Sequence, residues 1–215
     1  MIKPNFQTRM EEMLAGFREK PRLLLHVCCA PCSSSVLERL APSAHVTAFF
    51  DNPNLDSQQE YDRRAQEEQR FARQSGLAQV VVMPYDPDAF LEAAAGLEDA
   101  PEGGERCRAC FRLRLARAAQ YAKEQGFDLF TTTLTVSPLK NAAMLNAIGQ
   151  EMGEKYGIPF LPSDFKKKEG YKRSTQLSKE YDLYRQDYCG CVFSKNERDK
   201  RVRAQLEKAA EGEQA

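Results

Sequence analysis

All seven cysteines of this 215-residue chain lie in three short segments. The segments are HVCCAPC with Cys28, Cys29 and Cys32, ERCRAC with Cys107 and Cys110, and YCGC with Cys189 and Cys191. Buried structural cysteines behave as small apolar residues and scatter through a core, whereas thiolate ligands of zinc or iron come in tight groups. The clustering therefore indicates metal binding or redox chemistry.

The second segment has the two-residue spacing of a metal-binding pair. Cys107 and Cys110 stand at the start of a predicted helix, whose N-terminus lowers thiol pKa, and the spacing lets both sulfurs face one metal. The first segment supplies further thiols at the tip of a predicted strand, where adjacent side chains are no longer held on opposite faces. Four cysteines suit either a closed zinc site or a 4Fe-4S cluster, and spacing alone does not separate the two.

The third segment places Cys189 and Cys191 on either side of Gly190. A disulfide across so short a gap is strained and easily reduced, as a dithiol that shuttles electrons requires. The alternative interpretation is that these cysteines are two more metal ligands.

Several further residues could bind a ligand or transfer a proton, but for each of them a structural role is an equally good or better interpretation. His26, inside a predicted strand, is expected to be a core histidine rather than a ligand. Asp51 and Asp164 are candidate oxygen or proton donors, or turn and capping residues. Lys140, just before a predicted helix, either binds one phosphate together with the helix N-terminus or belongs to a plain cap.

Charge is balanced overall but unevenly spread. The chain has 31 Lys or Arg and 31 Asp or Glu, yet residues 163–203 hold 12 basic and 7 acidic residues. Within this stretch Phe165 and Tyr171 alternate with basic residues, which is typical of a surface that tracks phosphates and stacks bases. A solvated surface loop is the competing interpretation. The basic residues concerned are Lys166, Lys167, Lys168, Lys172 and Arg173.

The elements that position these residues follow from the apolar pattern. Short apolar runs predict strands at 23–27, 46–50, 80–83, 128–134 and 159–161. Helices are predicted at 6–17, 33–40, 57–75, 88–95, 107–125, 142–156, 175–185 and 195–207. This alternation predicts an α/β fold: an open parallel, Rossmann-like (nucleotide-hydrolase-like) sheet of about five strands flanked by helices. We expect one domain at 1–208, with a basic helical extension at 165–208 and a disordered tail at 209–215.

Ligands of an open parallel sheet bind at the carboxyl ends of its strands. The first cysteine segment, residues 51–54 and residues 131–140 all follow strands at that edge. The first loop, CCAPCSSS, contains no glycine to cradle a phosphate, which argues against ATP use. The sequence has no apolar run of signal-peptide or membrane-span length, so we expect a cytoplasmic protein without membrane contact, where thiols stay reduced.

The sequence resembles the QueH family of epoxyqueuosine reductases from about residue 23 to residue 194. The strings that carry the resemblance are LLLHVCCAPC, NPN followed by EYDRR, ERCRACFRLRL, TTTLTVSPLKN, DFKKKEGYKRS and YRQDYCGCVFS. Asp51, before NPN, departs from the aromatic residue expected there. The resemblance implies reduction of epoxyqueuosine to queuosine at the tRNA wobble position, the last step of queuosine biosynthesis.

By position, the resemblance implies that Cys28, Cys29, Cys107 and Cys110 hold a 4Fe-4S cluster and that Cys189 and Cys191 form a redox-active pair. Cys32 would then be the candidate ligand of a second, mononuclear iron. The expected partners are the tRNA anticodon stem-loop, bound by Lys140 and the basic residues at 166–173, and an external electron donor. Two other functions remain open: a zinc-stabilised, non-catalytic tRNA-binding module, and a tRNA sulfur-transfer enzyme.

Overall fold

The computed structural model describes residues 5–212, and the side chains of residues 5–207. Its centre is a four-stranded parallel sheet in the order β3-β2-β1-β4. The strands are β1 (Arg22–Val27), β2 (His45–Phe50), β3 (Gln79–Val82) and β4 (Leu129–Thr132). The expected α/β class and open parallel sheet are confirmed.

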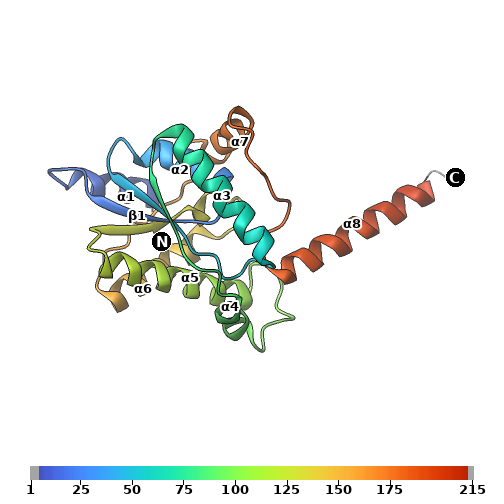
Figure 1. The fold of residues 1–215 in the computed structure, drawn as a ribbon. Coiled ribbons are helices and arrows are strands. Elements are labelled where there is room, and N and C mark those ends of the chain that lie inside the picture. Colours follow the sequence, from blue (N-terminus) through green and yellow to red (C-terminus); the bar gives the residue numbers. More distant parts are fainter. Residues whose placement is uncertain (1–4, 213–215) are drawn as a thin grey trace.

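Eight α-helices connect the strands or follow them in the chain, and helices cover both faces of the sheet (Figure 1). They are α1 (Phe6–Ala15), α2 (Ala30–Leu40), α3 (Gln58–Ser75), α4 (Pro87–Ala94), α5 (Glu105–Glu124), α6 (Ala142–Tyr156), α7 (Gly170–Glu180) and α8 (Val192–Gly212). A 3-10 helix at Thr133–Val136 follows β4. No helix among the described residues is both long and apolar enough to cross a membrane.

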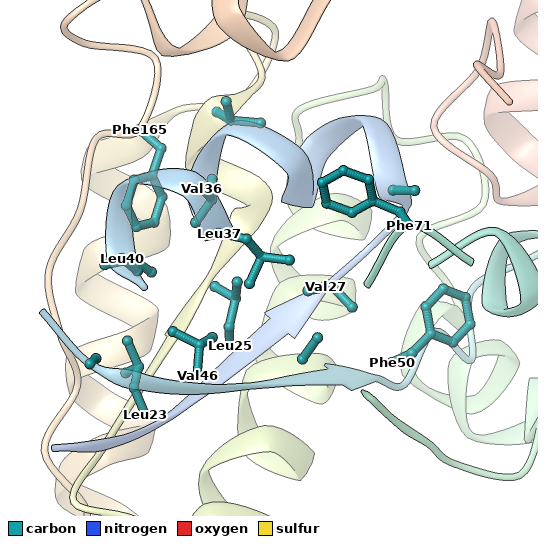
Figure 2. Packing of buried hydrophobic residues seen from close by; sticks show 14 of the residues in the cluster. Leu23, Leu25, Val27, Val36, Leu37, Leu40, Val46, Phe50, Phe71 and Phe165 are labelled. Atoms are coloured by element: carbon teal, nitrogen blue, oxygen red, sulfur yellow. The ribbon is translucent and has the colours of Figure 1, made fainter. Parts of the chain in front are cut away.

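Strand β1 is buried on both sides, as its apolar sequence RLLLHV predicts. Leu23, Leu25 and Val27 point into one core, which α2 and α3 cover, and Leu24 points into the other, which α5 and α6 cover. Figure 2 shows the first core, where side chains of α2 pack over these three strand residues. The alternation fixes the register of β1, so its carboxyl end presents Cys28 and Cys29 at the sheet edge.

The fifth strand expected at 159–161 is wrong. That segment makes only one isolated bridge, between Phe160 and Phe130 of β4. Pro159 and Pro162 stand on either side of the bridge and have no backbone N–H to donate, so the pairing ends there. The run expected at 128–134 is also shorter as a strand, because the chain turns into the 3-10 helix at Thr133.

Two helices begin or end away from their expected positions. Helix α7 covers Gly170–Glu180 instead of 175–185, because Ser174, Leu177 and Ser178 are the residues it buries, and it packs closely on α2. Helix α8 runs from Val192 to Gly212, beyond the expected end at 207 and through part of the stretch expected to be a disordered tail. The last three residues of that tail lie outside the described residues.

Candidate metal centre

Each cysteine segment lies at the N-terminus of a helix. Cys29 is the N-cap residue of α2, Cys107 is in the first turn of α5, and Cys191 directly precedes α8. The unpaired N–H groups at a helix start carry partial positive charge and favour anions. The helix starts therefore favour thiolate charge at all three segments, but burial outweighs this effect at Cys107 and Cys110 and raises the pKa of both.

The first segment gathers three sulfurs. Helix α2 begins at Ala30 with Pro31 in its first turn, so Cys32 already belongs to the helix and its side chain returns toward Cys28 and Cys29. The Sγ atoms of Cys28 and Cys29 are 3.8 Å apart, and all three sulfurs lie within 4.8 Å of one another. Among residues 5–207, this is the group of His, Cys, Asp or Glu residues compact enough to hold a metal ion.

The protonation of this trio suits metal binding. Hydrogen bonds from Cys29 and Cys32 hold the pKa of Cys28 well below its ordinary value. Donating to Cys28 raises the pKa of Cys29 to about 12 and places that of Cys32 well above its usual range. The two thiols thus favour negative charge on the Cys28 sulfur. A metal ion or cluster provides the positive charge that three buried thiolates need.

The second and third segments lie together. Cys110 and Cys191 share a small apolar cluster with Phe90 and Ala94, and each is 8 % exposed. Burial raises the pKa of Cys110 to about 12 and also raises that of Cys107, whose sulfur accepts a hydrogen bond from the N–H of Gly103. All seven cysteines are free thiols in the structure.

Arg114, which the sequence pattern did not indicate, connects the three segments. It is 2 % exposed. Burial is the largest single influence on its pKa and lowers it, but Cys110, Cys28 and Cys189, one residue from each segment, together raise the pKa above its ordinary value. Its guanidinium donates to Oδ1 of Asn52 at 2.5 Å. The buried cation thus faces thiols from all three segments.

Arg64 is a second buried cation, with 1 % of its side chain exposed. It pairs with Glu60 at 2.7 Å and donates to the backbone carbonyl of Cys189 at 3.3 Å. Its charge acts on Cys29 and Cys28. Each arginine lies on the buried face of its helix, at a position where the periodicity predicts an apolar residue. A basic residue at such a position is the sequence feature that could have indicated these buried cations.

Gly190 lets the third segment approach Arg64. Its φ is +126°, and a Cβ atom there would lie 2.5 Å from Cδ2 of Leu55 and 3.0 Å from Nη1 of Arg64. The Gly190 carbonyl also accepts a hydrogen bond from the N–H of Asp56 at 2.9 Å. Only glycine fits this backbone without displacing its neighbours.

A pocket of about 370 Å³ opens over the first and third segments. Its volume is in the range of small-molecule sites. Cys189 lines this pocket, whereas Cys191 is buried. The wall combines thiols, cations and aromatic rings: Cys28, Cys29, Cys32, Cys189, Arg114, Lys140, Arg198, Arg201, Tyr171 and Tyr188.

Lys140 belongs to this pocket rather than to a helix cap. The cap of α6 is Asn141, whose side chain accepts from the N–H of Met144. Lys140 is half-buried, and the nearby Cys189, Cys28 and Cys32 raise its pKa, with Cys189 the largest influence. Its ammonium group therefore adds a third positive charge beside the thiols.

The basic residues expected to track phosphates lie on α7 and the loop before it, and most are paired with acids. Lys166 pairs with Asp164 at 2.8 Å, and Arg173 bridges Glu38 and Glu180 at 2.8 and 2.9 Å. Lys168 pairs with Glu11 and Lys172 with Glu169. Lys167 makes no ion pair within residues 5–207. These pairs reduce the net charge that this surface offers to a polyanion.

The other candidates have structural roles. His26 is fully buried, its Nδ1 is 2.9 Å from the Thr132 hydroxyl, and burial lowers its pKa to about 3, so it is the core histidine that was expected. Asp51 is 1 % exposed and pairs with Arg117 at 2.6 Å. Asp51 and Asp164 therefore both act within ion pairs.

Comparison with known proteins gives the family. The family model described as "Epoxyqueuosine reductase QueH" matches residues 23–197. The chain belongs to the QueH family of epoxyqueuosine reductases. Two curated QueH epoxyqueuosine reductases illustrate the match. That of Streptococcus pyogenes serotype M1 is 43 % identical over 200 residues, which cover 89 % of this chain and 78 % of the relative. That of Thermotoga maritima is 38 % identical over 179 residues, covering 82 % and 91 %.

The fold is also shared with a distant solved structure. The U34-tRNA thiolase NcsA from Methanococcus maripaludis, solved with its [4Fe-4S] cluster, superposes with a TM-score of 0.54 at 13 % identity. The superposition covers 88 % of this QueH chain and 67 % of the thiolase chain. At this identity the likeness concerns the fold alone, and it confirms the expected architecture.

Proposed function

We propose that this QueH protein reduces epoxyqueuosine to queuosine in tRNA, in the cytoplasm, with electrons from a 4Fe-4S cluster and an external donor. The observation that carries the proposal is the convergence of all three cysteine segments on Arg114, beneath one pocket. A zinc-stabilised binding module would need four thiols, and this chain has seven in the three segments that Arg114 connects.

The proposed cluster ligands are Cys28, Cys29, Cys107 and Cys110. The first two come from the tip of β1 and the last two from the start of α5, so a cluster between them would have ligands from two elements and two helix N-termini. When bound, such a cluster supplies electrons one at a time. Arg64 and Arg114 support the assignment, because buried guanidinium groups offset the negative charge that a four-thiolate cluster brings into a core.

Opening the epoxide to the alkene consumes two electrons and two protons and releases water. We propose Cys189 and Cys191 as the second electron store: their oxidation to a disulfide releases two electrons and two protons, which balances the reaction. Two electrons from the external donor and two protons from solvent would then return the disulfide to the dithiol. The position of Cys189 in the pocket wall, with Cys191 behind it, supports this role.

Cys32 is the proposed ligand of a second, mononuclear iron. Its sulfur lies within 4.8 Å of those of Cys28 and Cys29, beside the proposed cluster, and the four-cysteine cluster does not need it. Iron content after anaerobic reconstitution tests the assignment: five irons per chain are expected, with four in Cys32→Ala. Four irons in both proteins would remove the second site.

Substrate binding is assigned to the pocket and the cations around it. Tyr171 and Tyr188 in the wall offer surfaces on which a base can stack, and Lys140 offers a cation beside the thiols. The proposed contacts for the anticodon stem-loop are Lys166, Lys167, Lys168, Lys172 and Arg173. The ion pairs of all but Lys167 must open for these residues to bind phosphate.

The function is tested by anaerobic incubation of the reconstituted protein with epoxyqueuosine-containing tRNA and a low-potential reductant, followed by nucleoside mass spectrometry. We expect epoxyqueuosine to be replaced by queuosine. Cys107→Ala should abolish both the iron-sulfur EPR signal and the conversion. Stable zinc at one per chain without iron uptake would contradict the cluster, and appearance of a thiolated nucleoside would favour sulfur transfer instead.

A further inference from the structure

Helix α8 begins at the pocket and then leaves the body of the protein. Its first three turns contribute Ser194, Glu197, Arg198 and Arg201 to the pocket wall, the spacing of one helix face. Beyond that point the helix projects outward as a separate rod (Figure 1). Residues 201–207 are all exposed. Twenty-one helical residues span about 30 Å.

This projecting part has little intrachain packing to stabilise it. Isolated helices shorter than about 12–15 residues are marginal in water, and most helical stability in proteins comes from packing. A binding partner that covers the segment from Lys200 onward would therefore stabilise its helical conformation.

The charges on α8 indicate the partner. Its earlier cations are paired: Lys195 with Asp56, and Arg198 with Asp187 at 2.7 Å and with Asp199 at 2.8 Å. Within residues 5–207, Lys200, Arg201 and Arg203 make no ion pair, in contrast to most of the basic residues at 166–173. Three unpaired cations on a rod that starts at the substrate pocket suit the phosphates of a nucleic acid whose modified nucleotide enters that pocket.

We propose that α8 binds the sugar-phosphate backbone of the substrate tRNA through Lys200, Arg201 and Arg203. The inference rests on the proposed function, because tRNA is the polyanion that function requires. It goes beyond the family match, which ends at Glu197, before all three residues. Phosphate contacts of this kind position the RNA without reading its sequence, so the loss of these cations should weaken binding to any tRNA.

The test compares two triple variants in the holoenzyme. Lys200→Gln/Arg201→Gln/Arg203→Gln removes the three α8 cations, and Lys20→Gln/Lys123→Gln/Lys155→Gln removes three exposed lysines near the amino ends of the strands. We measure tRNA affinity by fluorescence anisotropy over a salt series. The α8 variant should bind roughly 10- to 100-fold more weakly, and its slope of log affinity against log salt should be smaller by about 2. The control variant should lose less than about 3-fold.

Equal losses in both variants, or none in either, would overturn the proposal.

A second copy of the chain is the competing occupant, because Val202 and Leu206 are 40 % and 65 % exposed one turn apart. Sedimentation of wild type and Leu206→Ser decides this: a dimer that the substitution dissociates, with tRNA affinity unchanged in the α8 triple variant, would assign the helix to self-association. Wild-type turnover of epoxyqueuosine tRNA in the same preparation keeps this result separate from failure of the proposed function.

Discussion

At the scale of single residues, the site depends on charges that few sequence arguments would place in a core. Arginine is almost never fully buried unless it is paired, yet Arg64 and Arg114 are 1 % and 2 % exposed. Arg64 has Glu60 as a partner, whereas Arg114 has a neutral amide and the thiols of three segments. Arg114 is therefore best satisfied when those thiols are ionised, as metal ligation requires.

Arg114→Leu tests this electrostatic role. Without the cation, the thiolate cluster should bind iron less firmly and be harder to reduce, so we expect lower iron retention and a more negative midpoint potential in an EPR redox titration. Arg112→Leu, which removes a half-exposed guanidinium on the same helix, should leave potential and iron unchanged. The same potential in all three proteins would contradict the role.

Gly190→Ala tests the backbone between Cys189 and Cys191. The added methyl meets Leu55 and Arg64 at a φ of +126°, so it must displace one of them or the loop. We expect a loss of about 1–3 kcal/mol in the free energy of unfolding and a larger loss of turnover, because the dithiol moves. Urea unfolding and the nucleoside assay measure the two effects. Gly76 has a φ of +66° and open space around its Cβ position, so Gly76→Ala measures the cost of the positive φ alone. If both variants behaved alike, the close approach to Arg64 would have no role.

The cysteines were predictable because thiols at such close spacings either bind a metal or react with one another. The arginines and Lys140 were not, because their roles depend on which chain segments pack against them. Arg114 follows Cys110 by one helical turn, so its proximity to one thiol follows from the sequence, but its proximity to Cys28 and Cys189 exists only in the fold.

At the scale of elements, a buried polar contact joins α2 to α3 beneath the first cysteine segment. The hydroxyl of Ser33 donates to Glu68 at 2.7 Å, and Glu68 is fully buried, with its second carboxyl oxygen unpaired. Burial raises the pKa of Glu68 to about 8. The folded protein therefore holds a proton on Glu68 at neutral pH that the unfolded chain, with a pKa of 4.5, releases.

This proton makes stability depend on pH. Folding raises the pKa of this carboxyl group, so the group contributes its full stabilisation of the folded state below the unfolded pKa. That stabilisation is lost as the pH rises toward 8. His26 has the opposite sign, because its pKa is lowered to about 3 and its contribution is lost as pH falls below 6.5. Between pH 6.5 and 8 the Glu68 effect lowers the free energy of unfolding by about 1.4 kcal/mol per pH unit. The lowered pKa of Cys28 acts in the opposite direction, so the difference between wild type and a Glu68 variant isolates the Glu68 effect.

Urea unfolding of the metal-free protein at pH 6.5, 7.2 and 8.0 measures this slope, and Glu68→Gln is the matched variant because it keeps the shape without the titration. Relative to wild type, the free energy of unfolding of the variant should rise by about 1.4 kcal/mol per pH unit over this interval. An equal slope in wild type and Glu68→Gln would assign the pH dependence to another group.

Most elements followed from the sequence because their apolar patterns are regular. The helix expected at 142–156 matches α6 residue for residue, capped by Asn141 and ended by Gly157. The errors lie where tertiary contacts decide. Helix α7 is polar, and its position is set by the serines it buries against α2 rather than by an apolar repeat. The segment at 159–161 has strand composition but prolines at both ends of its bridge.

At the scale of the whole molecule, the fold brings three helix N-termini to one site. The carboxyl edge of the sheet positions α2, the long connection after β3 returns α5 to the same edge, and the last third of the chain brings the start of α8 over it (Figure 1). Sequence order predicts the first of these placements from the topology of parallel sheets. The third depends on contacts between residues more than 100 positions apart, such as Arg64 with Cys189.

The central proposal is that this one site holds a cluster and a separate dithiol, and that the dithiol supplies the two electrons of each turnover. A single-turnover experiment tests it most directly: reduced protein, freed of excess reductant, is mixed anaerobically with epoxyqueuosine tRNA, and queuosine is counted by mass spectrometry. Wild type should form about one queuosine per chain, whereas Cys189→Ser should retain its iron and EPR signal and form almost none. An equal yield from Cys189→Ser, or loss of its iron, would contradict the account.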